Sequence, residues 1–132
     1  MSESDDRTAT PAVRGTISFT IVERSENRVV GEMPVQPGIL NPYGVAHAGA
    51  LLWLADVCAT SLLLGDGDAG GSSFPLAIQL SAAFLANQRD GVFQATSTFV
   101  KRGRRVSVVR TTVSGASGRI VADVTTTHVA AG

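Results

Sequence analysis

One carboxylate, Asp56, stands in the middle of a segment, residues 46–64, in which nearly every side chain is small or apolar. The segment is long enough for a helix of several turns, and its apolar character on all sides predicts a buried helix. The helical neighbours of Asp56 include Leu52, Ala59 and Thr60, so no polar stripe surrounds it. Because burial of an unpartnered carboxylate is costly, this position favours a functional aspartate over the more common aspartate on a solvent-facing stripe.

Partners for this carboxylate are scarce in the neighbouring sequence. No lysine or arginine lies between residues 29 and 88. Thr60, four residues after Asp56, shares its helix face and can hydrogen-bond the carboxylate or a water molecule bound to it. A buried carboxylate in such surroundings can act as a base, and this is the chemistry that we expect of Asp56.

The start of the same helix offers a second chemical feature. Ala48, Gly49 and Ala50 are small, so a ligand can approach the free backbone N–H groups of the first turn. These donors and the helix dipole can stabilise a developing oxyanion. Small residues also permit tight packing, and the sequence alone leaves both interpretations open.

Cysteine and histidine form weaker patterns. Cys58 and His47 could act as nucleophile and base, but eleven positions of one helix separate them, or about 16 Å at about 1.5 Å per residue. They cannot touch within one chain, so we interpret Cys58 as a small core residue. The other histidine, His128, lies in a different element, and two histidines do not indicate a metal site.

A basic run, residues 101–110, holds five of the eleven positive side chains and no acidic one. Arg102, Arg104 and Arg105 flank Gly103 in a predicted turn. Arginines in this arrangement suit phosphate groups. A basic turn is also common at the solvated tip of a hairpin, and from the residues alone that interpretation is the simpler one.

The elements that must position these residues can be predicted from hydrophobic alternation and turn residues. We expect the helix at residues 46–64 and strands at residues 15–23, 28–35, 75–86, 91–101, 104–114 and 119–129. This order predicts an α+β fold in which an antiparallel sheet of about six strands wraps around one long central helix. A single sheet covers only part of an all-apolar helix, so we expect a second subunit to cover the rest.

The bulk composition bounds the domain and its partners. The chain has 132 residues, 44% of them apolar, which predicts one domain over residues 14–132 after a flexible tail over residues 1–13. Eleven basic and eleven acidic side chains cancel, so no overall field attracts nucleic acid or an anionic membrane. The single cysteine and the polar N-terminus favour a cytoplasmic protein.

The segment NPYGVAHAGALLWLADVCAT resembles the hot-dog fold acyl-CoA thioesterases, especially the phenylacetate-degradation type and the related 4-hydroxybenzoyl-CoA thioesterase. That family carries Asn or Gln, then Gly, then His-Gly-Gly, and an acidic residue nine positions after the histidine. Asn41, Gly44, His47 and Asp56 fall on this pattern. The resemblance extends over about residues 15–130.

The resemblance implies a role for each matching residue. Asp56 would be the general base or the nucleophile, and Thr60 would hold the water molecule or the carboxylate. Asn41 would orient the attacking water or the thioester carbonyl. Ala48 replaces the first glycine after the histidine, but its N–H would still polarise that carbonyl. His47 would shape the loop rather than act as a base.

The resemblance also implies a substrate and an assembly. An acyl-CoA with an aryl-acyl or medium-chain group would be hydrolysed to free acid and CoA without a retained cofactor. The CoA phosphates could use Arg102, Arg104 or Arg105. Each site would form between two subunits of a homodimer within a homotetramer. Two alternatives stay open: a non-catalytic acyl-CoA-binding protein, and a hot-dog hydratase, for which the sequence predicts no second histidine near the helix.

Overall fold

The computed structural model describes residues 16–65 and 74–130. The tail predicted over residues 1–13 and most of the glycine-rich loop after the helix lie outside the described residues. In chain order the elements are β1 (Thr20–Arg24), β2 (Arg28–Pro34), the 3₁₀ turn η1 (Pro37–Ile39), α2 (Ala48–Leu64), β3 (Pro75–Phe84), β4 (Val92–Lys101), β5 (Val106–Ser114), the 3₁₀ turn η2 (Ala116–Gly118) and β6 (Ile120–Ala130).

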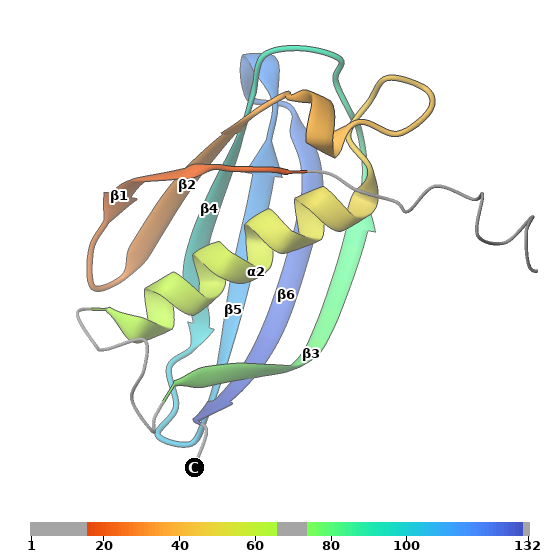
Figure 1. The fold of residues 1–132 in the computed structure, drawn as a ribbon. Helices are drawn as coiled ribbons and strands as arrows, with labels where there is room; N and C mark the ends of the chain where they lie inside the picture. The colour runs from red at the N-terminus through yellow and green to blue at the C-terminus, as the bar shows by residue number, and fades with distance from the viewer. Residues whose placement is uncertain (1–15, 66–73, 131–132) are drawn as a thin grey trace, which may run out of the picture.

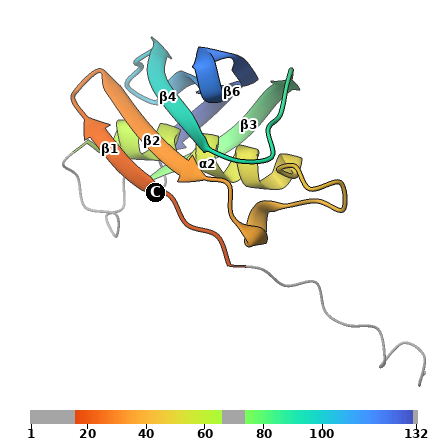
Figure 2. The ribbon, with the colours of Figure 1, turned by 90° about the horizontal axis from the view of Figure 1, so that it is seen from above.

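The six strands form one antiparallel sheet in the order β1-β2-β4-β5-β6-β3. The sheet curls around α2, which crosses its concave face (Figure 1). Seen along the perpendicular direction, α2 lies on one side of the sheet only (Figure 2). The predicted architecture, about six antiparallel strands around one long helix, is therefore confirmed.

The core forms where alternate strand residues meet one face of α2. In β4 and β5 every second side chain is buried along most of the strand, as expected for a sheet with one covered face. The largest fully buried side chains include Phe93, Met33, Ile39, Leu51 and Leu54. The helix and the strands therefore share one apolar layer that fixes the position of α2 on the sheet.

The first strand begins five residues later than predicted. Residues 16–19 precede the β1 ladder, although Phe19 still packs on Trp53 of α2 with ring centroids 5.0 Å apart. The Gln36 side chain accepts a hydrogen bond from the Ser18 N–H at 3.0 Å and donates one to the Ser18 carbonyl at 2.9 Å. An amide side chain thus replaces the neighbouring strand as the partner of this segment.

One face of α2 and one edge of the sheet are uncovered in the single chain. On α2 the side chains of Trp53, Val57 and Thr60 are exposed or half-buried, so the helix is not buried on all sides within one subunit. The edge strand β3 exposes a series of apolar side chains, including Ile78, which is 61% exposed.

No helix in the described ranges is both long and apolar enough to cross a bilayer.

Candidate active site

Asp56 lies on α2 where the face covered by the sheet meets the uncovered face, between buried Ala59 and exposed Trp53. The residue is half-buried, and its Oδ1 atom is shielded from solvent without a hydrogen-bond partner in the described part of the chain. Asp56 and Thr60 line one pocket of about 370 Å³ between α2 and the start of β3. The walls include Val57, Leu64 and Leu76, so the carboxylate faces a mainly apolar space.

The start of α2 presents free backbone donors. The helix begins at Ala48, two residues later than predicted, and His47 caps it by accepting the Ala50 N–H on Nδ1 at 3.1 Å. Within the described residues the N–H groups of Ala48 and Gly49 donate no hydrogen bond. Both residues are exposed. The N-terminus of α2 therefore carries two accessible N–H donors, the arrangement needed to bind an oxyanion.

Asn41 organises the loop that leads to the helix. Its Oδ1 atom accepts the N–H groups of Tyr43 at 2.9 Å and Val45 at 3.3 Å. Gly44 has φ of 81°, a left-handed conformation in which a side chain is strained. The side-chain oxygen of Asn41 is thus engaged in the loop, and only its NH₂ group remains to contact a ligand.

Asn87, which the sequence analysis did not single out, holds the other side of this loop. Its side chain accepts the Ala46 N–H at 3.2 Å and donates to the Ala46 carbonyl at 2.8 Å. Arg89 donates to the carbonyl of Tyr43 in the same loop. These contacts hold the backbone of Ala46 next to the histidine cap and explain why α2 starts two residues after the predicted position.

Within one chain the two halves of this site lie apart. The pocket that contains Asp56 and Thr60 does not include Asn41, His47 or Ala48. Ala48 and Asp56 are eight positions apart on one helix, a rise of about 12 Å along its axis. One subunit therefore brings the carboxylate and the threonine together, but does not bring them to the free N–H groups.

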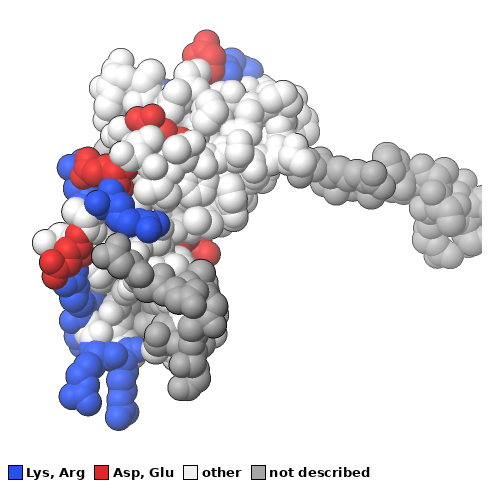
Figure 3. Space-filling model, turned by 60° about the vertical axis from the view of Figure 1, so that its left-hand side comes forward, with Lys and Arg blue, Asp and Glu red and all other residues white. Residues whose placement is uncertain are grey.

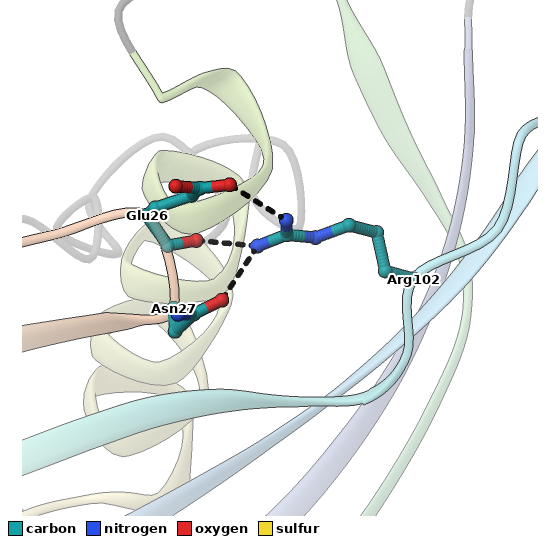
Figure 4. A network of polar contacts seen from close by, with 3 residues as sticks. All are labelled: Glu26, Asn27 and Arg102. Atoms are coloured by element: carbon teal, nitrogen blue, oxygen red, sulfur yellow. Dashed lines mark hydrogen bonds and ion pairs between the residues drawn. The ribbon is translucent and has the colours of Figure 1, made fainter.

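The arginines of the β4–β5 turn fall into two groups. Arg102 reaches back to the β1–β2 turn, where it meets Glu26 at 3.4 Å and Asn27 at 3.1 Å (Figure 4). Its guanidinium also lies 4.2 Å from the centre of the Phe99 ring. Arg102 therefore connects the β4–β5 turn to the β1–β2 turn, and its guanidinium is less available to a phosphate than those of Arg104 and Arg105.

Arg104 and Arg105 line a second pocket, of about 300 Å³, at the C-terminal end of α2. Basic side chains gather at this end of the molecule, at the bottom of the space-filling view (Figure 3). Leu64 and Pro75 line both this pocket and the one that contains Asp56. A ligand at Asp56 can therefore extend towards two exposed arginines.

The amino-acid sequence was compared with the profiles of known protein families. The family profile described as the thioesterase superfamily matches residues 43–122, more than half of the chain. The chain belongs to the thioesterase superfamily. The match includes α2 with Asp56 and Thr60, and it ends within β6. No curated protein matches the chain.

Solved structures share the fold of this thioesterase over most of its length. A thioesterase variant from Staphylococcus aureus is 21% identical, with a TM-score of 0.81, and the match covers 86% of this chain and 93% of that one. A hypothetical thioesterase from Streptococcus pneumoniae, solved with coenzyme A, is 24% identical (TM-score 0.79; 92% and 95% covered). A Streptococcus mutans protein bound to acetyl-CoA is 23% identical (TM-score 0.79; 94% and 97% covered). The fold is thus the hot-dog fold that the sequence predicted.

The lone cysteine of this thioesterase is a core residue, as its position predicted. Cys58 is fully buried on the face of α2 that meets the sheet. Burial raises the pKa of its thiol to about 12, so the nucleophilic thiolate is scarce at neutral pH. Among the described residues no group of three or more His, Cys, Asp or Glu side chains could hold a metal ion.

The expectation that no second histidine lies near the helix is wrong. His128 of β6 is buried on the helix-facing side of the sheet and lines the pocket of Arg104 and Arg105. Burial lowers the pKa of His128, while the charge of Asp56 raises it. Ala77, the β3 residue opposite His128, lines the pocket of Asp56, so both side chains border the same region between α2 and β3. Strand alternation could have revealed this position, because His128 has the same parity as the buried Val124.

Proposed function

We propose that this thioesterase hydrolyses acyl-CoA thioesters to a free acid and CoA, with Asp56 as the general base or nucleophile. The observation that carries the proposal is a shielded carboxylate in a mainly apolar pocket that it shares with Thr60. The apolar walls suit an aryl-acyl or medium-chain group, because such groups gain free energy when they leave water. The pocket of Arg104 and Arg105 next to it suits the phosphates of CoA.

The proposed chemistry combines the Asp56 carboxylate of one chain with the Ala48 N–H of a second chain. As a base, Asp56 takes a proton from water while the water oxygen attacks the thioester carbon. The N–H of Ala48 stabilises the oxyanion, and its collapse expels the CoA thiolate, which recovers the proton from Asp56. As a nucleophile, the carboxylate attacks the same carbon, expels the thiolate and forms an anhydride that water then cleaves. Thr60 holds the carboxylate or the water in either case.

We further propose that two subunits build each site. The uncovered face of α2 and the apolar edge of β3 need a partner, and an antiparallel second helix would bring the Ala48 N–H of one chain beside Asp56 of the other. A homodimer meets this need, and homodimers can pair into a homotetramer. The separation of about 12 Å between Ala48 and Asp56 within one helix supports this assembly.

Relatives add support to the substrate and to the residues. The Streptococcus pneumoniae protein was solved with coenzyme A and the Streptococcus mutans protein with acetyl-CoA. In the Staphylococcus aureus protein, alanine replaces a glutamate in one structure and a glutamine in another, at positions 15 residues apart. Asn41 and Asp56 have the same separation here. The equal spacing supports a joint role of an amide and a carboxylate in this protein.

Replacement of Asp56 by asparagine tests the proposal. Asp56→Asn keeps the shape and loses the basic charge, so we expect kcat for the best substrate to fall by at least about 100-fold. Thiol release from a panel of aryl and straight-chain acyl-CoA thioesters gives the measurement. Asp90→Asn, which changes an exposed aspartate in a turn, is the matched control and should retain wild-type kcat.

The outcomes separate the open alternatives. Wild-type activity in Asp56→Asn would exclude the role of Asp56. Tight acyl-CoA binding without thiol release by the wild-type protein would favour the non-catalytic binding protein instead. Mass spectrometry of enzyme quenched during turnover distinguishes the two mechanisms, because only a nucleophilic Asp56 carries the acyl group.

A further inference from the structure

His128 is a buried histidine with one ring nitrogen satisfied and the other not. Its side chain is 1% exposed, and on β6 it lies between Ala77 of β3 and Ser107 of β5. Its Nε2 atom is 2.7 Å from the hydroxyl of Thr126. Its Nδ1 atom is shielded from solvent and has no partner in the described part of the chain. A buried polar atom in this state is rare and calls for a partner.

The surroundings of His128 offer few such partners. Ala77 has no polar side chain, and the hydroxyl of Ser107 already bonds the N–H and carbonyl of Gly103 at 3.1 and 3.2 Å. Arg104 and Arg105 are exposed on the wall of the same pocket. Among the described residues, Asp56 of α2 is a charged group on this side, because its pocket is lined by Ala77, the β3 residue opposite His128.

Asp56 presents the complementary deficit. Its Oδ1 atom is shielded from solvent and lacks a partner, as the Nδ1 atom of His128 does. In the ionised carboxylate, Oδ1 of Asp56 can only accept a hydrogen bond. Nδ1 of His128 is a donor when it carries the ring proton. Leaving both unsatisfied costs more free energy than joining them.

We propose that His128 is a positioning residue for Asp56 in the thioester hydrolysis proposed above. The Thr126 hydroxyl donates to Nε2, which places the ring proton on Nδ1. From there the ring donates to a bridging water molecule, which in turn donates to Asp56 Oδ1, because the two atoms do not bond each other directly. The contact fixes the carboxylate from the sheet side, so that its other oxygen faces the pocket of Thr60 and the reacting carbon. The inference rests on the proposed role of Asp56 and adds a residue from a different element to it.

Nitrogen NMR of the full-length protein tests the pair without any substrate. We expect His128 to show the Nδ1–H tautomer in the wild type and a lower pKa in Asp56→Asn, because the charge that raises its pKa is lost. A His47→Gln sample assigns the two histidine signals. An Nε2–H tautomer together with an unchanged pKa in Asp56→Asn would overturn the proposal, even if the protein hydrolyses no thioester.

Kinetics then test positioning against a merely structural role. His128→Phe removes both nitrogens, and we expect kcat to fall roughly tenfold with KM almost unchanged, as for other groups that orient a reacting side chain. His128→Asn keeps a donor near the Nδ1 position and should restore most of kcat. His128→Gln keeps only the contact with Thr126 and should not.

The double variant gives the deciding comparison. If His128 acts through Asp56, adding His128→Phe to Asp56→Asn lowers kcat no further. An additional tenfold loss in that background, or equal losses for His128→Asn and His128→Phe, would show that the imidazole serves the fold alone. Failure of Asp56→Asn itself to lose activity would instead contradict the proposed function.

Discussion

At the scale of single residues, the buried imidazole of His128 makes stability depend on pH. Its pKa in the folded protein is lowered by burial, so the unfolded chain takes up the proton first as pH falls. Stability is therefore fully present above the unfolded value of about 6.5 and is lost as pH falls through the folded value. We expect the free energy of unfolding to drop between pH 7.5 and 5, as measured by urea denaturation.

His128→Phe provides the comparison for this prediction, because it removes the titrating group. The variant should lose that part of the pH dependence, whatever its stability at pH 7.5. Asp123, whose pKa is lowered by its hydrogen bonds from Arg110, titrates below this window and does not interfere. Equal slopes in the wild type and in the variant would show that another group causes the effect.

The residues of the site differ in how far the sequence could predict them. Asp56 and Thr60 could be predicted because a carboxylate in an apolar helix needs a reason, and the structure places both in one pocket. Asn87 could not, since its contact with Ala46 joins segments 41 positions apart that no local pattern relates. Strand alternation indicated that His128 lies on the same face of β6 as Val124, but the sequence did not show that α2 packs on that face.

At the scale of elements, we expect the β4–β5 turn to combine a binding role for Arg104 and Arg105 with a structural role for Arg102. Reversal of charge at Arg104 and Arg105 should raise KM for acyl-CoA several-fold, but not for a short thioester without the nucleotide, because phosphate contacts add uniform binding. Arg102→Ala is the matched control. It should lower the melting temperature through the lost contacts to Glu26 and Asn27 while leaving KM near the wild-type value. Equal changes in KM for both substrates would identify the turn as a solvated hairpin tip.

Apart from the start of β1, element boundaries were predictable to within two residues because prolines, glycines and alternation are local signals. β2, β4 and β5 end within one residue of the prediction. The strand order was not predictable in this way, since β2 pairs with β4 across the whole of α2 and β3, and β3 pairs with β6. Such pairings depend on how the helix packs on the sheet, and the sequence pattern of one strand does not indicate which strand pairs with it.

At the scale of the whole molecule, the proposed mechanism needs a second chain, and the single chain leaves part of its apolar surface uncovered. Trp53 on one face of α2 and several residues of the edge strand β3 are exposed apolar side chains, and the free N–H groups lie about 12 Å along the helix from the carboxylate. One partner subunit would answer both deficits. We therefore expect the second chain to bind on the uncovered face of α2, where it would also bring its Ala48 N–H close to Asp56.

Subunit complementation tests this shared site. Ala48→Pro removes one N–H at the first helical position, where proline is tolerated, and the extended ψ of 154° at His47 suits a following proline. We expect Ala48→Pro and Asp56→Asn homodimers to be nearly inactive. Heterodimers carrying different tags, purified through both, would contain one site with both defects and one wild-type site. Their activity should recover to about half of the wild type. If each chain builds its own site, every site in the heterodimer keeps one defect and the activity stays at the level of the parents.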